Sequence, residues 1–391
     1  MSTSTPYPPP LRKKKRRPIK KKASWLRRFN DWFHLWVGIV TGIPIVLISL
    51  TGCLLVFEQE ITHLFQPWWT IEAQAEENLL PPSVIRQRVQ QQLPDMEIRR
   101  FWYYGLEAPV KITPEHSDSL IFANPYTGKV VALVDHENFF HWMDEGHRYL
   151  WLPADIGRSV VTWCTAIFFA MLITGLVLWW PTKFSARQIK EAFTIRWRSK
   201  WKRINYDLHN VLGFYSLLVA LLMAFTGLIM GFLWLRNGVY DLLGGDGKRE
   251  AVELVQEWKP NVPQEMDGKI DAIWQKVTRE LGEKNRLEIS IHYPKEEATS
   301  IYACTDMSNG TWRELYFDKQ TLALLPTSQV KISDEIPSKW MMRSNYALHT
   351  GYIGGMFTKW LYFFASLICA SLPITGFYIW WGKKTKKKRK I

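Results

Sequence analysis

Histidines recur at matched positions in two apolar stretches of this 391-residue chain. The first stretch contains His34 and Gly52, and the second contains His209 and Gly227 at the same spacing. That spacing corresponds to five turns of an α-helix, so each histidine and its glycine would share one helix face, about 27 Å apart. That length is close to the thickness of the hydrocarbon core of a bilayer. Each stretch is therefore expected to carry a histidine near one membrane surface and a glycine near the other.

Two further histidines stand before two other apolar stretches. His147 precedes Gly175, and His349 precedes Gly376, at spacings that differ by a single position. Both glycines belong to the same pattern, a Thr-Gly pair followed by three residues and a Trp-Trp pair. Ionisable side chains within a membrane are costly and are usually functional, so four histidines at repeated positions point to a site.

Imidazoles at equal depth on facing helices can ligate the iron of a b-type haem when small residues leave space for the macrocycle. We predict that His34 and His209 ligate one haem iron, and that His147 and His349 ligate a second. The two haems would carry electrons across the bilayer. The glycines expected to clear room for the rings are Gly38 and Gly213 at the first haem, and Gly52 and Gly227 at the second.

Other roles compete for these residues. A single histidine at a membrane surface is most often a polar anchor, glycines often serve plain helix packing, and the Trp-Trp pairs are typical of interfacial belts. The threonines of the Thr-Gly pairs are expected to hydrogen-bond within their own helices, with a haem propionate as the alternative partner. His141, six residues before His147, is an alternative ligand. No Cys-x-x-Cys-His motif occurs, so covalent haem attachment is not expected. The histidines expected to be solvated or outside the site are His63, His116, His136 and His292.

Four apolar segments are long enough to span a membrane and must position these residues. Pro44 is expected to kink the first of them. The predicted spans are 31–58, 160–182, 207–235 and 356–382. The remaining segments are a basic arm at 1–30, long segments at 59–159 and 236–355, a basic loop at 183–206 and a tail at 383–391.

Basic residues set the predicted orientation. Nine Lys or Arg residues fall within 12–22, eight within 183–203 and seven within 383–390. With four spans these segments share one side, which the excess of positive charge makes the cytoplasmic side, with both termini inside. The formal net charge of +14 therefore reports topology rather than nucleic-acid binding. Basic segments of this kind can also hold anionic lipid.

The two long segments show the same order of elements. Each is expected to form a helix, two strands and a hairpin, so the chain would consist of two similar halves, 30–182 and 205–383, arranged as parallel repeats. The predicted fold class is a mainly α membrane protein: a four-helix transmembrane bundle from two parallel repeats, with two α+β outer modules. The predicted elements are 83–93, 98–104, 110–113, 120–124 and 129–134, then 270–281, 287–293, 300–303 and 313–317, with a turn at 318–321.

Three sequence patterns resemble those of the PepSY-associated transmembrane family, over about 25–385. They are His-x3-Gly with a later Thr-Gly, Leu-His-x3-Gly, and Leu-His-Thr-Gly with a later Thr-Gly-x3-Trp-Trp. That family includes iron-regulated inner-membrane proteins and siderophore reductases of the FoxB type. The resemblance implies four helices and PepSY modules in the periplasm of a bacterium. In the reductases it also implies two b-type haems with histidine ligands.

The expected function is that of an inner-membrane di-haem b oxidoreductase similar to ferric-chelate reductases. Electrons would come from a cytoplasmic flavoprotein or from quinol, because no nucleotide-binding glycine motif occurs in the chain. The acceptor would be a periplasmic Fe(III) chelate, with a ferrisiderophore as the first choice, and reduction would favour release of the iron. The alternatives are a haem-free periplasmic binding or regulatory membrane protein and a transporter component. Beyond the histidines, no catalytic residue is assigned.

Overall fold

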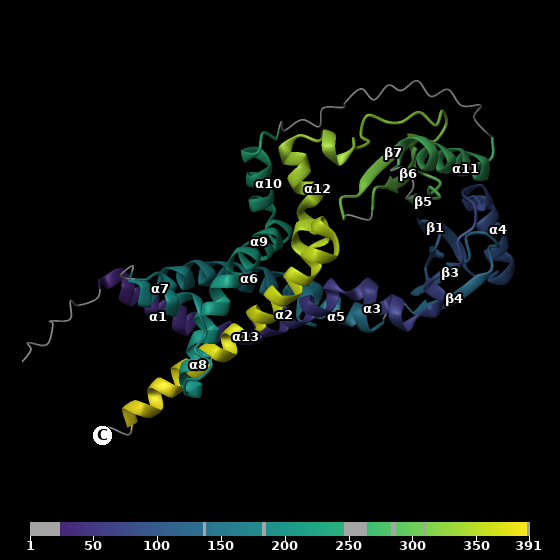
Figure 1. The fold of residues 1–391 in the computed structure, drawn as a ribbon. Coiled ribbons are helices and arrows are strands. Elements are labelled where there is room, and N and C mark those ends of the chain that lie inside the picture. Colours follow the sequence, from purple (N-terminus) through teal and green to yellow (C-terminus); the bar gives the residue numbers. More distant parts are fainter. Residues whose placement is uncertain are drawn as a thin grey trace, which may run out of the picture.

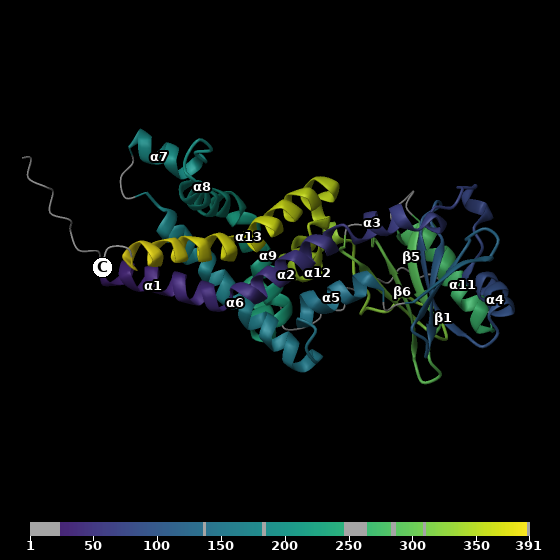
Figure 2. The ribbon, with the colours of Figure 1, turned by 90° about the horizontal axis from the view of Figure 1, so that it is seen from below.

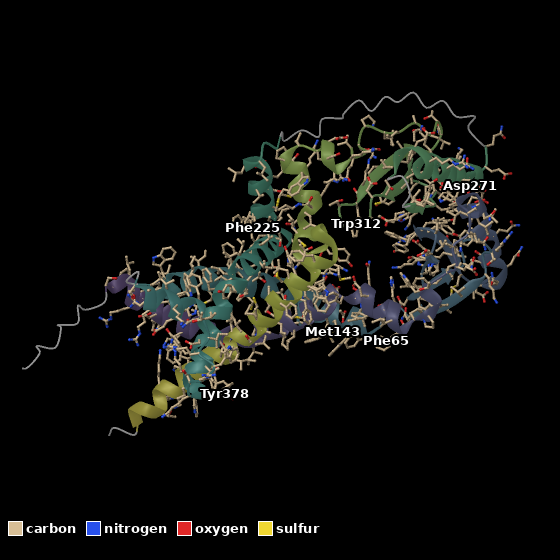
Figure 3. The ribbon with its side chains drawn as sticks, viewed as in Figure 1. Phe65, Met143, Phe225, Asp271, Trp312 and Tyr378 are labelled. Atoms are coloured by element: carbon tan, nitrogen blue, oxygen red, sulfur yellow. The ribbon has the colours of Figure 1, made fainter. Side chains whose placement is uncertain are left out.

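The structure is a computed structural model that describes residues 24–135, 138–181, 185–245, 264–282, 287–307 and 310–388. Helices make up one end of the molecule and a β-sheet makes up the other (Figures 1 and 2). Tyr378 and Asp271 mark these two ends, and Met143 lies between them (Figure 3). We call the helical end the basic end, because the C-terminal lysines lie there, and we call the other end the sheet end. The predicted basic arm lies mostly outside the described residues, as does His136.

Within the described residues, three helices are long and apolar enough to cross a membrane, or four if one bent pair counts as a span. No more than a third of the most apolar window of each long helix is buried, as expected for helices that face lipid. The long helices are α6 (Ala154–Trp179), the run from α8 (Trp201–Asp207) through a π-helical turn (Leu208–Leu212) to α9 (Gly213–Gly231), and α13 (Gly355–Lys388). The bent pair is α1 (Trp25–Val40) and α2 (Gly42–Val56).

The bend between α1 and α2 measures 64° and lies at Thr41. Pro44 has no backbone N–H to donate to the carbonyl four residues earlier, so the helix loses a hydrogen bond at this point, as the sequence predicted. The bend corrects another prediction. His34 and Gly52 do not lie on one straight five-turn stripe, because the bend separates them.

The sheet has seven antiparallel strands in the order β4-β3-β2-β1-β5-β6-β7. The predicted strands are confirmed, and the central pair β1–β5 joins the two long segments of the chain. The two predicted modules are therefore halves of one continuous sheet rather than independent units. The strands are β1 (Glu97–Tyr104), β2 (Val110–Glu115), β3 (Ser119–Ala123), β4 (Val130–Asp135), β5 (Glu288–His292), β6 (Ser300–Thr305) and β7 (Arg313–Asp318).

Helices α4 (Pro82–Gln92) and α11 (Met266–Lys276) cover one face of the sheet. Alternate strand residues such as Phe101 and Ile289 are fully buried beneath them. Each such side chain stabilises the fold by about 1.5–3 kcal/mol. Asp271 of α11 also accepts a hydrogen bond of 3.0 Å from the backbone N–H of Ser83, at the start of α4. One core thus stabilises both halves of the sheet.

Short helices connect the sheet to the spans. Helices α5 (Phe139–Tyr149) and α12 (Pro337–Thr350) carry His147 and His349, and they pack against α2 and α9. Asn138 caps α5, since its Oδ1 accepts hydrogen bonds from the N–H groups of Phe140 and His141. Among the described residues, the remaining short α-helices are α3 (Glu58–Phe65), α7 (Ala186–Phe193) and α10 (Leu233–Leu242).

An ion pair fixes α3 to the start of α13 where the spans meet the sheet end. Lys359 Nζ lies 2.7 Å from Glu60 Oε1 and 4.0 Å from the ring centre of Tyr352, and Lys359 is only 4% exposed. A second lysine, Lys111 on β2, lies near Glu58 at the start of α3. Burial lowers the pKa of Lys111, and the Glu58 carboxylate opposes that shift. Loss of Glu60 would leave the buried ammonium group of Lys359 without its carboxylate partner, so the pair links α3 to α13.

Candidate functional site

Four histidines form two pairs near opposite ends of the helices. The rings of His34 and His209 have centres 6.4 Å apart and are nearly perpendicular, at 88°. The rings of His147 and His349 have centres 6.1 Å apart at an angle of 59°. We call these the inner pair and the outer pair. Each pair joins one histidine from each half of the chain.

Each inner histidine contacts a Thr-Gly pair on a neighbouring span. His34 Nδ1 lies 3.0 Å from Thr174 Oγ1, on α6. His209 Nδ1 lies 2.9 Å from Thr375 Oγ1, on α13. A Cβ atom on Gly175 or on the glycine after Thr375 would stand 3.2 or 3.3 Å from the facing imidazole. The glycines therefore let the rings lie directly against the helix backbone.

The outer histidines have the same environment. His147 Nδ1 lies 2.9 Å from the carbonyl oxygen of Ile48 and 3.3 Å from Thr51 Oγ1, on α2. His349 Nδ1 lies 2.9 Å from the carbonyl oxygen of Met223 and 3.1 Å from Oγ1 of Thr226, on α9. All four histidines thus bind through Nδ1 to a Thr-Gly motif.

These hydrogen bonds determine the tautomer of the outer rings. A carbonyl oxygen only accepts, so Nδ1 of His147 and of His349 must carry the hydrogen. The hydroxyl of Thr51 donates to the carbonyl of Leu47, 2.8 Å away, which leaves its oxygen lone pairs to accept from the ring. The Nε2 lone pair is then left for a metal ion. Binding one ring nitrogen in this way is how proteins orient a ligating histidine.

Asparagines reinforce three of the four contacts. Asn30, Asn205 and Asn345 each stand four residues before a histidine of the pairs, one helical turn away. Their Nδ2 atoms donate to the carbonyls of the facing threonines, over 3.2, 3.0 and 3.1 Å respectively. Met143 occupies the corresponding position before His147. These asparagines were not predicted from the sequence, although their constant spacing from the histidines is visible there.

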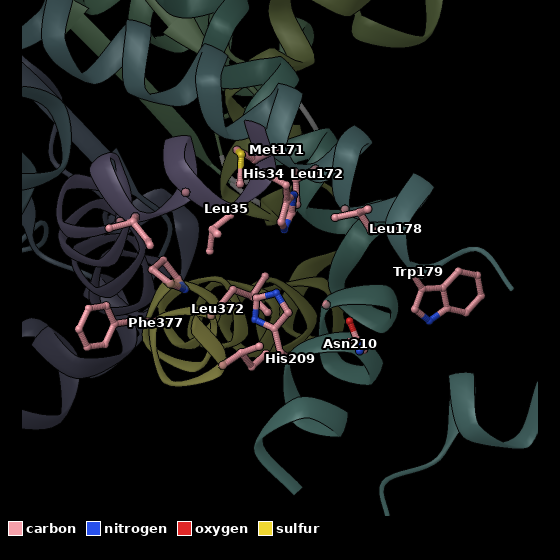
Figure 4. A pocket seen from close by; sticks show the side chains of 18 of the residues that line it. His34, Leu35, Met171, Leu172, Leu178, Trp179, His209, Asn210, Leu372 and Phe377 are labelled. Atoms are coloured by element: carbon pink, nitrogen blue, oxygen red, sulfur yellow. The ribbon is translucent and has the colours of Figure 1, made fainter. Parts of the chain in front are cut away.

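A cavity of about 560 Å³ opens at the inner pair. His34 and His209 reach into it from opposite sides (Figure 4), and Gly38 and Gly213 are among the residues that line it. Pockets that hold cofactors commonly measure about 300–1,000 Å³. The wall is mostly apolar. Its charged or phenolic members are Arg27, Asp31, Tyr206 and Lys383, all from the end of the helices that carries the basic tail.

The sequence pattern of the family described as PepSY-associated TM region matches residues 32–383. The chain belongs to this family. No curated protein matches the chain. Membership of the PepSY-associated family and the apolar helices together identify a membrane protein.

The geometry of this PepSY-associated protein can be tested against a haem. An imidazole nitrogen lies about 1.1 Å from the ring centre and a metal–imidazole bond is about 2.0 Å long, so the axial imidazoles of one iron have centres about 6.2 Å apart. The observed separations of 6.4 and 6.1 Å agree with that value. The apolar cavity with cations at one end also suits haem b, which has an apolar ring and two carboxylates on one edge. The residues at the inner pair therefore fit the group, while the outer pair matches it in ring separation.

The role predicted for two glycines needs correction. Gly52 and Gly227 were expected to clear room for the second macrocycle, but a Cβ at these positions would lie 3.0 and 3.2 Å from the rings of His147 and His349. They make room for the imidazole itself. Gly175 and Gly376 do the same at the inner pair, although they were not predicted from the sequence as site residues.

The other described histidines of this PepSY-associated protein lie apart from the pairs. His141 Nε2 is 3.8 Å from Glu145 Oε1 on the surface of α5, one helical turn away, and it is not part of the outer pair. His292 lies on β5, where its Nε2 is 3.0 Å from Ser290 Oγ, and His63 packs on Trp69 at the sheet end. The alternative ligand His141 is therefore less well placed than His147.

Proposed function

We propose that the chain is a di-haem b protein that carries electrons across a membrane, from the basic end to the sheet end. The observation that carries this proposal is the distance between the imidazole ring centres, 6.4 Å in the inner pair and 6.1 Å in the outer pair. One iron would fit between two rings at this distance. Haem, when bound, supplies one-electron transfer, and its potential depends on its axial ligands and their hydrogen bonds.

Residues of the chain would hold the two haems and adjust their reduction potentials. His34 and His209 would ligate one iron, and His147 and His349 the other. The Nδ1–H groups donate to backbone carbonyl and threonine oxygens, which makes Nε2 a stronger donor to iron and fixes the plane of each ring. Arg27 and Lys383 at the rim of the cavity would neutralise the carboxylates of the inner haem.

The two pairs would lie at different depths of the bilayer. The helical run from Trp201 to Gly231 carries His209 near its start and Gly227, which contacts His349, near its end. Five turns of helix measure about 27 Å. Electrons that enter at the inner pair would therefore leave near the sheet, across most of the hydrocarbon core.

The proposed reaction is ferric-chelate reduction, as in a siderophore reductase. The donor would be a cytoplasmic flavoprotein or quinol, and each Fe(III) would take one electron at the sheet end. Hard oxygen ligands hold Fe(II) less strongly than Fe(III), so iron is released after reduction. The resemblance of the chain to the reductases of its family supports this choice of acceptor.

The proposal includes a topology. Taking α1 and α2 as one bent span gives a bundle of four spans in two parallel repeats, with both termini in the cytoplasm and the sheet in the periplasm. Reporter fusions after Asp135 and after Lys319 should therefore report an outside location, and a fusion at Lys190 an inside location. A cytoplasmic signal from the Asp135 fusion would contradict the four-span arrangement and the different depths of the two pairs.

Haem content is the direct test of the function. The purified protein should be red, and a pyridine haemochrome assay should give two haem b groups per chain, with a redox-difference spectrum typical of low-spin iron. A ratio of one would remove one pair from the proposal. The absence of a Soret band would end it and would favour a haem-free binding or regulatory role for the sheet.

A further inference from the structure

The segment from the end of α7 into the first turn of α8 has a surface that the proposed function does not use. It alternates large aromatic and basic side chains and lies at the basic end of the helices. We call it the connecting loop. Its aromatic and basic residues are Arg196, Trp197, Arg198, Lys200, Trp201, Lys202 and Arg203.

A buried carboxylate holds this loop in place. The Asp207 side chain is 1% exposed, accepts a hydrogen bond of 3.2 Å from the backbone N–H of Arg196 and lies 2.8 Å from Nη2 of Arg203. Glu191 at the end of α7 pairs with Arg196 over 3.1 Å. Two of the arginines are thus occupied by inward ion pairs that set the shape of the loop.

Aromatic packing fixes α7 against the ends of the spans. The ring centre of Phe193 is 5.2 Å from that of Trp179 and 5.1 Å from that of Phe214. The indole N–H of Trp179 donates to the carbonyl of Ala192, and the Tyr215 hydroxyl donates to the carbonyl of Phe193, both over 3.2 Å. The loop after α7 is therefore held at the level where α6 ends and α9 begins.

The outward side of the connecting loop carries exposed cations and indoles. Arg198, Lys200 and Lys202 are exposed, and no described carboxylate pairs with them. Trp197 and Trp201 remain 67% and 63% exposed. Indole rings prefer the headgroup level of a bilayer, and basic side chains beside them attract anionic lipid. Purely electrostatic docking of an acidic protein gives no reason for two large indole rings to be exposed beside these cations.

We propose that the connecting loop is a binding site for the phosphate headgroups of anionic phospholipids. The three outward cations contact the phosphates, and Trp197 and Trp201 insert at the level of the headgroups. Asp207, whose carboxylate shapes this site, stands only two residues before the inner histidine His209 in the sequence. The site does not depend on haem, so it can hold even if the proposed redox function fails.

The test uses the full-length purified protein and a triple variant, Arg198→Gln, Lys200→Gln and Lys202→Gln. Both are equilibrated with equal amounts of dioleoylphosphatidylglycerol and dioleoylphosphatidylcholine in detergent, and native mass spectrometry counts the retained lipids. The wild-type protein should retain phosphatidylglycerol in preference to phosphatidylcholine. The triple variant should lose that preference by about tenfold or more, since each cation near a surface contributes separately.

A matched control removes the same charge from turns and loops at the sheet end, through Lys129→Gln, Arg279→Gln and Lys331→Gln. These side chains are exposed, so the control should fold normally and keep the wild-type lipid preference. Equal retention of phosphatidylglycerol by both triple variants would overturn the proposal and leave an acidic protein as the partner of the cations. Unchanged thermal unfolding of both variants shows that lost lipid reflects the site rather than misfolding.

Discussion

Replacing His209 with alanine should either remove one of the two haems, which reduces the measured ratio from two haems per chain to one, or leave that haem bound but high-spin. The His34→Ala variant should have the same spectrum, because the two rings lie 6.4 Å apart and would share one iron. The remaining haem should still be reduced by dithionite but no longer by the donor at the basic end. Pyridine haemochrome assays and electron paramagnetic resonance of both variants measure this.

Replacing a histidine of the outer pair should give the reverse result. In His349→Ala the inner haem should still accept electrons, while reduction of an Fe(III) chelate should fail. His141→Ala serves as the control and should retain both haems, because His141 faces Glu145 on the surface of α5. If His34→Ala resembles His147→Ala instead, the ligands pair within one half of the chain. Loss of a haem in His141→Ala but not in His349→Ala would show that the outer ligand is misassigned.

Replacing Gly376 with leucine should remove the inner haem as completely as the loss of His209 does. A Cβ atom at Gly376 would stand 3.3 Å from Cε1 of His209, and the rest of the leucine side chain extends further into the space of the ring. The imidazole would have to leave its contact with the neighbouring Thr375, and its Nε2 would no longer point at the iron. Haem stoichiometry and the spectrum of the remaining low-spin haem report this change.

Gly238→Leu is the matched control, because a Cβ on Gly238 meets no described atom within 4 Å. It makes the same substitution in another helix, α10, and should retain both haems. Retention of two low-spin haems by Gly376→Leu would show that the close approach of helix and imidazole is unnecessary for ligation. A variant that loses both haems would show instead that the fold of the helices has failed.

The sequence by itself determined the elements that rest on local patterns. The strands could be predicted because side chains alternate between a buried and an open face, as at Phe101 and its neighbours on β1. The turn at 318–321 followed from Asp318, whose Oδ1 accepts from the N–H of Thr321. The kink near Pro44 followed from a missing N–H group. Each of these signals lies within a few residues of the structure that it predicts.

The tertiary structure alone decided what the two halves share. The long segments were predicted as separate modules, but β1 pairs with β5 and places Phe101 opposite Ile291 in one sheet. Pairing between strands so far apart in the chain depends on which edges the connecting helices bring together. No local periodicity encodes that choice, because an open strand edge presents the same N–H and C=O groups to any partner.

For the candidate site too, part could be predicted from the sequence and part was decided by the tertiary structure. The sequence supplied the four histidines, since repeated spacing within apolar segments is visible in a single chain. It could not show that Gly376 faces His209 or that Gly52 faces His147, because these contacts join different helices. Nor could it show the size of the bend at Thr41, which changes the direction of the first span. Helix packing, which depends on every side chain at the interface, decides where a ring can rest on a glycine.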